Sequence, residues 1–453
     1  MAAKTSISSG ILYTDRRDFY ISPNVVNELH QDVTPFTTFL GKAGSISVND
    51  PVFKQFEYRN GWLDQYVITS EADQNAGAAG SVTVGNAGTT VDVLCSAATP
   101  GLGRNTQGAS QWNERELATP SFDSSAVGLV LQYKTGDNLL NLRVTSASNA
   151  TLTCSVIAKV GTVASIPVSA KLHVVGSAFA EGGVAPDASS DDITVVWGRT
   201  QIMKTSIEVT GTLYHMALRG YSDELARLRA EKMKEHKIQK ERSFLLGIDP
   251  SRSAYDTALT SALDNSDTRY SMGVIPSIIK FGKSYEATDN AGGKKANIFS
   301  FDATTSYSTF VDMMENLFAY IPSSQDSKIV FCGAGVLSFF SKPDAQALFK
   351  IGSTNNPFTL SEPIKTEWGF NVRKLNTPHG SISLAHAPVL RGDWRNYGVA
   401  IDTDYVKNYV FRPTSYTTAI KTDNAYDGVK DQIMSDEGVG LSMIEKHALI
   451  KVA

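Results

Sequence analysis

The stretch RGYSDELARLRAEKMKEHKIQKERSFLLG, from Arg219 to Gly247, constrains the fold more than any other part of the chain. Ser222 can cap a helix with its hydroxyl, and Asp223 places negative charge at the positive end of the helix dipole. Gly247 supplies the stop. The sequence therefore predicts a helix over residues 222–246, about 37 Å long at roughly 1.5 Å per residue.

This predicted helix has little apolar surface. Leu225, Leu228 and Met233 form a narrow stripe, and only its last turn looks bound to a core. Residues of opposite charge fall three or four apart, a spacing at which each pair stabilises a helix by about 0.2–0.5 kcal/mol. The pairs are Glu224–Arg227, Arg227–Glu231, Glu231–Lys234, Lys232–Glu235 and Lys237–Glu241. Such a helix can pack its narrow apolar stripe on a core and direct its charged side chains away from that core.

The charged helix is compatible to different degrees with three other kinds of structure. A solvated helix on a globular enzyme stays open from this window alone. A coiled coil is disfavoured because Lys232 follows Leu225 by seven residues and breaks the heptad. A DNA-reading helix is disfavoured because acidic residues interrupt the basic ones and would repel a polyanion.

Composition narrows the class of protein. A length of 453 residues predicts roughly two to four domains. The net charge of -4, from 42 basic and 46 acidic residues, is too balanced for bulk attraction to nucleic acid or to an anionic membrane. We expect a soluble protein made in the cytoplasm, because no stretch reads as a signal peptide or a membrane span. Cys95, Cys154 and Cys332 lie far apart and are predicted to be buried, reduced thiols.

Changes in the pattern of apolar and polar residues divide the chain into segments. Residues 1–48 look like an arm that ends in a small apolar patch of Phe36, Phe39 and Leu40, which needs a partner surface. Strand-like alternation in VFKQFEY returns in ITVVWGRTQIMKTSIEVTG, so residues 49–75 and 186–212 are predicted to be two sides of one long hairpin.

Between these two sides the composition changes. Residues 76–185 are rich in Gly, Ala, Ser, Thr and Val, with short alternating runs and turn dipeptides, which predicts a small inserted β-barrel or sandwich. Residues 256–395 alternate between strand-like and helix-like runs, as in an α/β or α+β domain. The last part of the chain is mostly strand-like.

No set of residues reads as an active site. Gly333 and Gly335 follow a strand and precede a helix, as in a dinucleotide-binding turn, but no acid stands about 20 residues further on. The seven histidines show no metal-binding spacing. We therefore expect no catalytic residue, no cofactor-binding residue and no metal ligand.

The order of these parts resembles the tailed-bacteriophage major capsid proteins of the Hong Kong 97 type, in the subgroup with a small β-barrel inserted in the E-loop. DVTPFTTFLGK resembles the arm segment before the E-loop. GSAFAEGGVAPD with WGRTQIMKTSIEVTGT resembles the returning E-loop, and DEGVGLSMIEKHALIKV resembles the closing strands. The resemblance extends over nearly the whole chain and rests on order and texture.

The resemblance implies an α+β fold with an inserted all-β domain. Its parts would be an N-terminal arm (1–48), the E-loop hairpin (49–75 and 186–212), the inserted β-barrel (76–185), a peripheral domain (213–255 and 396–453) with the spine helix 222–246, and an axial domain (256–395).

The resemblance also implies a function, which is to self-assemble into the icosahedral head that encloses double-stranded DNA. The subunits would form hexameric and pentameric capsomers, bind the packaged DNA non-specifically, and work with separate scaffold, portal and decoration proteins. The protein would be in the virion after assembly in the host cytoplasm, without a membrane, without a cofactor and without enzymatic activity.

The arm patch would dock on an adjacent copy, and the charged helix would meet neighbouring subunits. The expected subunit-interface residues are Phe36, Phe39, Leu40, Glu224, Arg227, Glu231, Lys234, Glu235 and Glu241.

Two alternatives stay open from the sequence. One is another virion protein of the tail or decoration type, which would suit the β-rich insert but not the long charged helix. The other is a nucleotide-dependent enzyme with an inserted β-domain, acting through Gly333 and Gly335.

Overall fold

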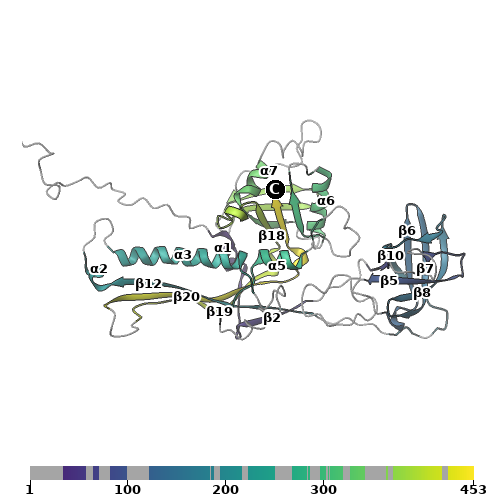
Figure 1. Cartoon of the computed structure of the whole chain (residues 1–453), viewed down its shortest axis with the longest axis horizontal. Helices are drawn as coiled ribbons and strands as arrows, with labels where there is room; N and C mark the ends of the chain where they lie inside the picture. Colours follow the sequence, from purple (N-terminus) through teal and green to yellow (C-terminus); the bar gives the residue numbers. More distant parts are fainter. Residues whose placement is uncertain are drawn as a thin grey trace, which may run out of the picture.

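A computed structural model gives the arrangement of the chain. It describes residues 34–57, 65–70, 82–98, 122–183, 185–187, 194–216, 223–249, 268–282, 284–285, 296–302, 305, 307–319, 327–341, 364–365, 371–420 and 427–452. Helix α3 lies along a four-stranded sheet, a seven-stranded sheet lies beside them, and a closed barrel lies at the far end of the long axis, beyond β2 (Figure 1).

The four-stranded sheet has the order β1-β19-β20-β12. Its strands are β1 (Ser45–Ser47), β12 (Gln201–Thr210), β19 (Val406–Thr417) and β20 (Gly428–Leu441). β1 runs parallel to β19, and the other pairs are antiparallel. Alternate residues of β12 are buried, which places one face of the sheet under α3. A short helix, α2 (Gly211–His215), follows β12.

Helix α3 spans Glu224–Leu246, within the predicted range. Its N-cap is Asp223, whose Oδ1 accepts a hydrogen bond from the Ala226 N–H at 3.0 Å. Asp223 therefore takes the capping role that was predicted for Ser222, a residue that lies outside the described part of the chain. At the other end, the Gly247 N–H donates to the Ser243 carbonyl at 2.8 Å, as a stop at Gly247 requires.

The seven-stranded mixed sheet has the order β13-β21-β18-β14-β17-β16-β15. The strands are β13 (Ile298–Phe301), β14 (Ser327–Cys332), β15 (Ile364–Lys365), β16 (Asn371–Thr377), β17 (Gly380–His386), β18 (Tyr397–Ile401) and β21 (Ala448–Val452). One face packs on α1 (Pro35–Ala43), α5 (Val274–Phe281) and the end of α3. The other face packs on α6 (Tyr307–Phe318) and α7 (Ala334–Ser341).

The segment 396–453, which the sequence analysis assigned to one peripheral unit, is divided between the two sheets. β19 and β20 lie beneath α3, whereas β18 and β21 lie inside the seven-stranded sheet. The physical reason is that β18 and β21 are buried along nearly their whole length, as strands covered on both faces are.

A two-stranded ribbon forms part of the predicted hairpin. β2 (Val52–Glu57) pairs antiparallel with β11 (Thr194–Arg199), in register from Val52–Arg199 to Glu57–Thr194. The ribbon is shorter than predicted, because the chain passes Thr200 and enters the four-stranded sheet as β12.

The predicted inserted domain is a closed barrel of the order β10-β3-β5-β8-β7-β6. Its strands are β3 (Tyr66–Thr69), β5 (Thr90–Ala98), β6 (Leu129–Thr135), β7 (Asn138–Ser148), β8 (Thr151–Val160) and β10 (Lys171–Ser177), with the small pair β4 (Val82–Thr83) and β9 (Ser165–Ile166) beside them. Its apolar core is made only of barrel residues. Cys95 and Cys154 are free and buried there, and Cys332 is free and buried in β14, as predicted.

The barrel begins earlier than residue 76. β3 is buried at all four positions and pairs with both β5 and β10, so it closes the barrel instead of lying in the hairpin. A strand buried on both sides cannot be one arm of a two-stranded ribbon, which always leaves a face uncovered.

This boundary generates a prediction. Replacing residues 65–178 by a short Gly-Ser linker removes the whole barrel, and we expect the remaining chain to stay folded and soluble, because its apolar clusters contain no barrel residue. Deleting residues 76–185 instead leaves Tyr66 and Val67 without their cover, and we expect aggregation. Solubility and amide hydrogen exchange of the two deletion variants check this, and equal behaviour of both would contradict the boundary.

Candidate subunit interface

The outward side of α3 carries ion pairs within the helix. Arg227 Nη2 lies 2.5 Å from Glu224 Oε1, and Arg227 Nη1 lies 3.0 Å from Glu231 Oε2. Lys232 Nζ lies 2.6 Å from Glu235 Oε2. These three predicted pairs are therefore confirmed. The side chains of Glu231 and Glu235 are 44% and 43% exposed, so a large part of each stays open to solvent in the single subunit.

The inward side of α3 meets β20 through polar pairs. Arg229 Nε donates a hydrogen bond to Asp431 Oδ2 at 2.8 Å, and Arg229 Nη2 lies 2.7 Å from the same oxygen. About three turns further on, Lys240 pairs with Glu437. The Asp431 side chain is 0% exposed and the Glu437 side chain 4% exposed. Charge thus holds the helix to the sheet where an apolar face would normally do so.

A buried histidine occupies the place between these two ion pairs. His236 Nδ1 lies 3.0 Å from Thr205 Oγ1 on β12, and Nε2 lies 2.9 Å from Ser435 Oγ on β20. Burial lowers the pKa of His236, and the neighbouring Lys240 lowers it further, so the ring is neutral and bridges the two strands. Its contribution to stability is present above about pH 6.5 and declines as the pH falls towards the lowered pKa.

The periodicities explain why these partners meet. Asp431, Ser435 and Glu437 lie on one face of β20, because side chains two apart share a face of a strand. On the helix, Arg229, His236 and Lys240 are seven and four apart, which places them on one stripe. The apolar part of the contact is small: Leu225 packs with Ile207, Val209 and Ile433, and the predicted stripe continues with Leu228 and Met233.

Asp431 on β20 accepts hydrogen bonds from several donors. Burial raises the pKa of Asp431, but hydrogen bonds from Tyr416, from the Ala419 N–H and from Arg229 outweigh it, so this pKa lies below its usual value. Asp431 therefore stays ionised opposite Arg229.

The sequence prediction for the arm patch is wrong about its partner. Phe36, Phe39 and Leu40 are 0%, 0% and 1% exposed within one chain, because α1 lies in the subunit's own core. Phe36 packs edge-on against Phe331 of β14 with ring centroids 5.3 Å apart. These three side chains have no surface left to offer an adjacent copy.

Glu241 also departs from its predicted place. Its side chain points inward, is 0% exposed, and accepts hydrogen bonds at Oε2 from the Thr37 N–H at 3.2 Å and from Thr37 Oγ1 at 2.7 Å. Burial raises its pKa to about 7, and the hydrogen bonds from α1 partly oppose this shift. Glu241 thus joins α3 to α1 of the same chain, not to Lys237. Of the predicted interface residues, Glu224, Arg227, Glu231, Lys234 and Glu235 lie on the part of α3 that β20 and α1 do not cover.

The ribbon also carries an exposed aromatic side chain that was not among the predicted interface residues. Phe53 stacks on Tyr409 with ring centroids 4.0 Å apart, whereas Phe56 is 73% exposed. The signal was present, because two residues three apart on a strand point to opposite faces, so one of these rings had to be uncovered. Glu57 fixes the inner face by accepting the Met443 N–H at 2.8 Å.

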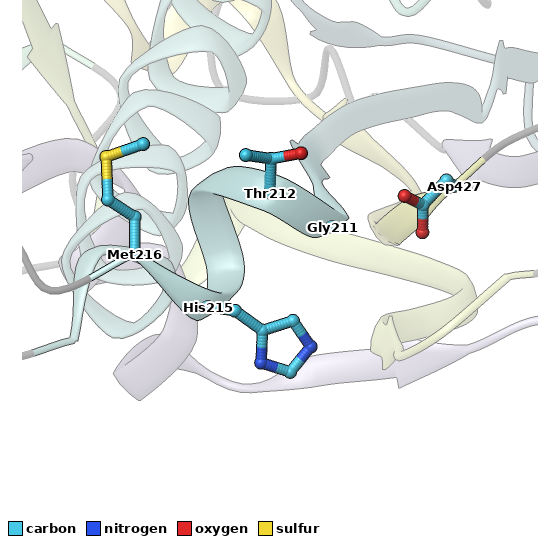
Figure 2. A pocket seen from close by; sticks show the side chains of 5 residues that line it. All are labelled: Gly211, Thr212, His215, Met216 and Asp427. Carbon is cyan, nitrogen blue, oxygen red and sulfur yellow. The ribbon is translucent and has the colours of Figure 1, made fainter.

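A shallow pocket lies at the tip where β12 passes into α2. Figure 2 shows its lining, which is Gly211, Thr212, His215, Met216 and Asp427. The Gly211 N–H donates to the Asp427 carbonyl at 3.0 Å, and a Cβ at Gly211 would lie 2.5 Å from Asp427 Oδ1. A larger residue at position 211 would therefore require the Asp427 side chain to move, and the lining of the pocket contains one histidine and one carboxylate.

The nucleotide alternative meets a physical obstacle. The Gly333 N–H donates to the Tyr397 carbonyl at 2.9 Å and the Gly335 N–H to the Arg395 carbonyl at 3.0 Å. A Cβ at Gly333 would lie 2.2 Å from the Arg395 oxygen. The chain itself therefore occupies the place of a phosphate, and these glycines serve packing.

The described part of the chain offers neither a metal site nor a membrane-spanning helix. It contains no group of three or more His, Cys, Asp or Glu side chains that could hold a metal ion. None of its helices has the length and apolar character needed to cross a membrane.

The partly exposed ion pairs of α3, the exposed ring of Phe56 and the barrel at one end of the long axis leave surfaces open to contact with other molecules. The chain belongs to the SU10 major capsid protein family, whose model matches residues 21–453. It is thus a major capsid protein that forms the phage head, and it resides in the virion. The tail and decoration alternatives are set aside by this match.

Solved capsid structures are similar to the chain at low identity. The capsid of a native GTA particle has 8% identity and a TM-score of 0.41, with 100% of both chains covered. Mycobacterium phage Cain has 8% identity and a TM-score of 0.44, with 99% of both chains covered. Mycobacterium phage Patience has 12% identity and a TM-score of 0.37, with 62% of this chain and 78% of that chain covered. No curated protein matches the chain.

The polar contact between α3 and β20 leads to a stability prediction. Glu437→Ala leaves Lys240 without its buried partner, and we expect the free energy of unfolding of the subunit to fall by about 3 kcal/mol. Glu235→Ala removes an exposed ion pair on the same helix and should change it by less than about 0.5 kcal/mol. Urea unfolding of both variants measures the difference, and similar values would show that the Lys240–Glu437 pair does not hold the helix.

Proposed function

We propose that the subunit builds an icosahedral shell of the Hong Kong 97 type around double-stranded DNA, from hexameric and pentameric capsomers. The observation that carries this proposal is the division of α3 into two charged sides. One side is neutralised by β20 of the same chain. The other side holds its charges in ion pairs along the helix, and the described chain leaves the Glu231 and Glu235 side chains there 44% and 43% exposed, without full cover. In a closed shell, neighbouring copies can provide that cover.

The order of the elements supports assigning the parts of that fold. In the proposal, α3 and the four-stranded sheet are the peripheral domain with its spine helix, and the seven-stranded sheet with α5, α6 and α7 is the axial domain. The β2–β11 ribbon is the base of the E-loop, and the barrel is the domain inserted in it.

The outward residues of α3 are proposed to set the register between subunits. They are Glu224, Arg227, Glu231, Lys234 and Glu235. Alternating charges along a rod match a neighbour only in certain alignments, and like charges placed opposite each other cost several kcal/mol, so such a face selects one docking position. The exposed ring of Phe56 on the ribbon offers an apolar anchor at a second place on the surface.

DNA contacts are proposed to be local and non-specific. The net charge of -4 gives no general attraction to the polyanion, so the packaged DNA would meet individual basic side chains at the inner wall. The scaffold, portal and decoration functions would come from separate proteins.

The charge-reversed variant Glu231→Lys with Glu235→Lys tests the role of α3. It removes helix pairs worth less than about 1 kcal/mol together, so the subunit should fold normally. At a subunit contact it places like charges opposite each other, and we expect far fewer shells by electron microscopy and sedimentation. The control is Asp137→Lys with Glu181→Lys, which changes the net charge equally on exposed barrel turns. Shell yields that do not differ between the two double variants would count against the α3 interface.

A second variant tests the ribbon. Phe56→Ser removes an exposed ring, so the free energy of unfolding of the subunit should change by less than about 0.5 kcal/mol. If the ring anchors a neighbour, capsomers should form more weakly, which the concentration dependence of sedimentation measures. Phe53→Ser is the matched contrast, because it removes the buried ring of the same strand and should destabilise the subunit itself. Unchanged assembly of the Phe56 variant would remove the ribbon from the interface.

A further inference from the structure

The Glu241 carboxyl joins two segments that are 204 positions apart in the sequence. Oε2 accepts both the N–H and the hydroxyl of Thr37, at 3.2 and 2.7 Å. Oε1 is buried, and the Phe36 N–H beside the carboxyl stabilises its charged form together with Thr37. A carboxyl group that is buried with only these few donors is a costly arrangement, and such groups usually have a role.

The position of this carboxyl relative to α1 is specific. α1 begins at Pro35, its N-cap Thr34 makes no side-chain hydrogen bond, and its first turn contains no acid. Glu241 reaches across from α3 and accepts the N–H of Thr37 in that first turn. It therefore supplies from another helix the capping acceptor that α1 lacks in its own sequence.

Among the residues that the structure describes, none provides a counter-ion for Glu241. Phe36, Phe39 and Phe244, which belong to the same two helices, are each 0% exposed. Glu241 has no ion-pair partner among the described residues, and no charged group is among the causes of its pKa shift. On α3 itself, the charged side chains within four residues of Glu241 are Lys237, Lys240 and Arg242. The charged side chains of the other elements packed against α1 or α3 include Lys42 on α1, Lys280 on α5, Lys407 and Arg412 on β19, and Lys430, Asp431, Asp436 and Glu437 on β20. Lys240 is held by Glu437.

We propose that Glu241 is a proton-dependent latch that fastens α1 to the long helix α3. In the closed latch the carboxylic acid donates its proton to Thr37 Oγ1, and the Thr37 hydroxyl donates to the Thr34 carbonyl, 3.3 Å away. Loss of the proton leaves a buried carboxylate that water stabilises better than α1 does, so α1 is released more readily.

The sign of the effect follows from linkage. Burial raises the pKa of Glu241 from an ordinary value of 4.5 to about 7 while α1 is docked. A raised pKa means that docking binds a proton, so docking is strongest below about pH 4.5 and weakens as the pH rises towards 7. With these two values the docking equilibrium of α1 falls about tenfold between pH 6 and pH 8. This property belongs to the single subunit and does not depend on shell assembly.

The test is amide hydrogen exchange of the full-length, unassembled subunit at several pH values, corrected for the chemical exchange rate. The opening constant of the Phe36–Ala43 amides should rise about tenfold from pH 6 to pH 8. Amides of β7 in the barrel should show no such rise. In Glu241→Gln, which keeps an acceptor for Thr37 but cannot ionise, the α1 amides should lose this pH dependence.

Two further variants complete the test. Glu235→Gln makes the same chemical change at an exposed position of α3 and should keep the wild-type profile. Thr37→Val removes a hydrogen bond that lowers the pKa of Glu241, so the midpoint of the α1 profile should move above pH 7. The latch is refuted if α1 of the wild-type subunit opens equally at pH 6 and pH 8, if Glu241→Gln retains the pH dependence, or if Thr37→Val leaves the midpoint unchanged.

Discussion

The buried polar contact between α3 and β20 is the interaction on which the rest of the subunit depends. A helix with so little apolar surface gains little from the hydrophobic effect, so its position comes from ion pairs and from hydrogen bonds through His236. Apolar faces can slide past each other at modest cost, whereas Arg229 and Lys240 each have one partner at one place on β20. With α3 fixed in rotation and in register, Glu241 faces α1 and Phe244 faces the core beside α5.

Much of this arrangement could be predicted from the sequence, because it depends on local patterns. The length of α3, its three helix-internal ion pairs and the inserted barrel all follow from spacing and turn residues. The inward charges could not be recognised. Arg229 and Arg227 look alike in the sequence, and what separates them is Asp431, which is 202 positions away. The same limit produced the error at Glu241, whose partner on α1 comes from an equally remote segment.

The arm patch shows a different limit. The clustering of Phe36, Phe39 and Leu40 correctly indicated that these side chains must be covered. Apolar burial is non-directional, so the pattern contains no information on whether the cover belongs to the same chain or to a neighbour. The predicted start of the barrel was wrong for a related reason. The sequence of Tyr66–Thr69 is typical of a strand, whether that strand belongs to the hairpin or to the barrel. Only its pairing with β5 and β10 shows that it belongs to the barrel.

The strand order also has a consequence for how the subunit folds as it is synthesised. In both large sheets, the strands made last among those described lie inside: β19 and β20 between β1 and β12, and β21 between β13 and β18. Helix α3 therefore exists for some 200 residues of synthesis before β20 can cover it. If the inward face of α3 were apolar, it would stay exposed until β20 is synthesised, and exposed hydrophobic surface promotes aggregation. Arginine, histidine and lysine on that face are well hydrated until their partners on β20 arrive, so the polar spine also keeps the nascent chain soluble.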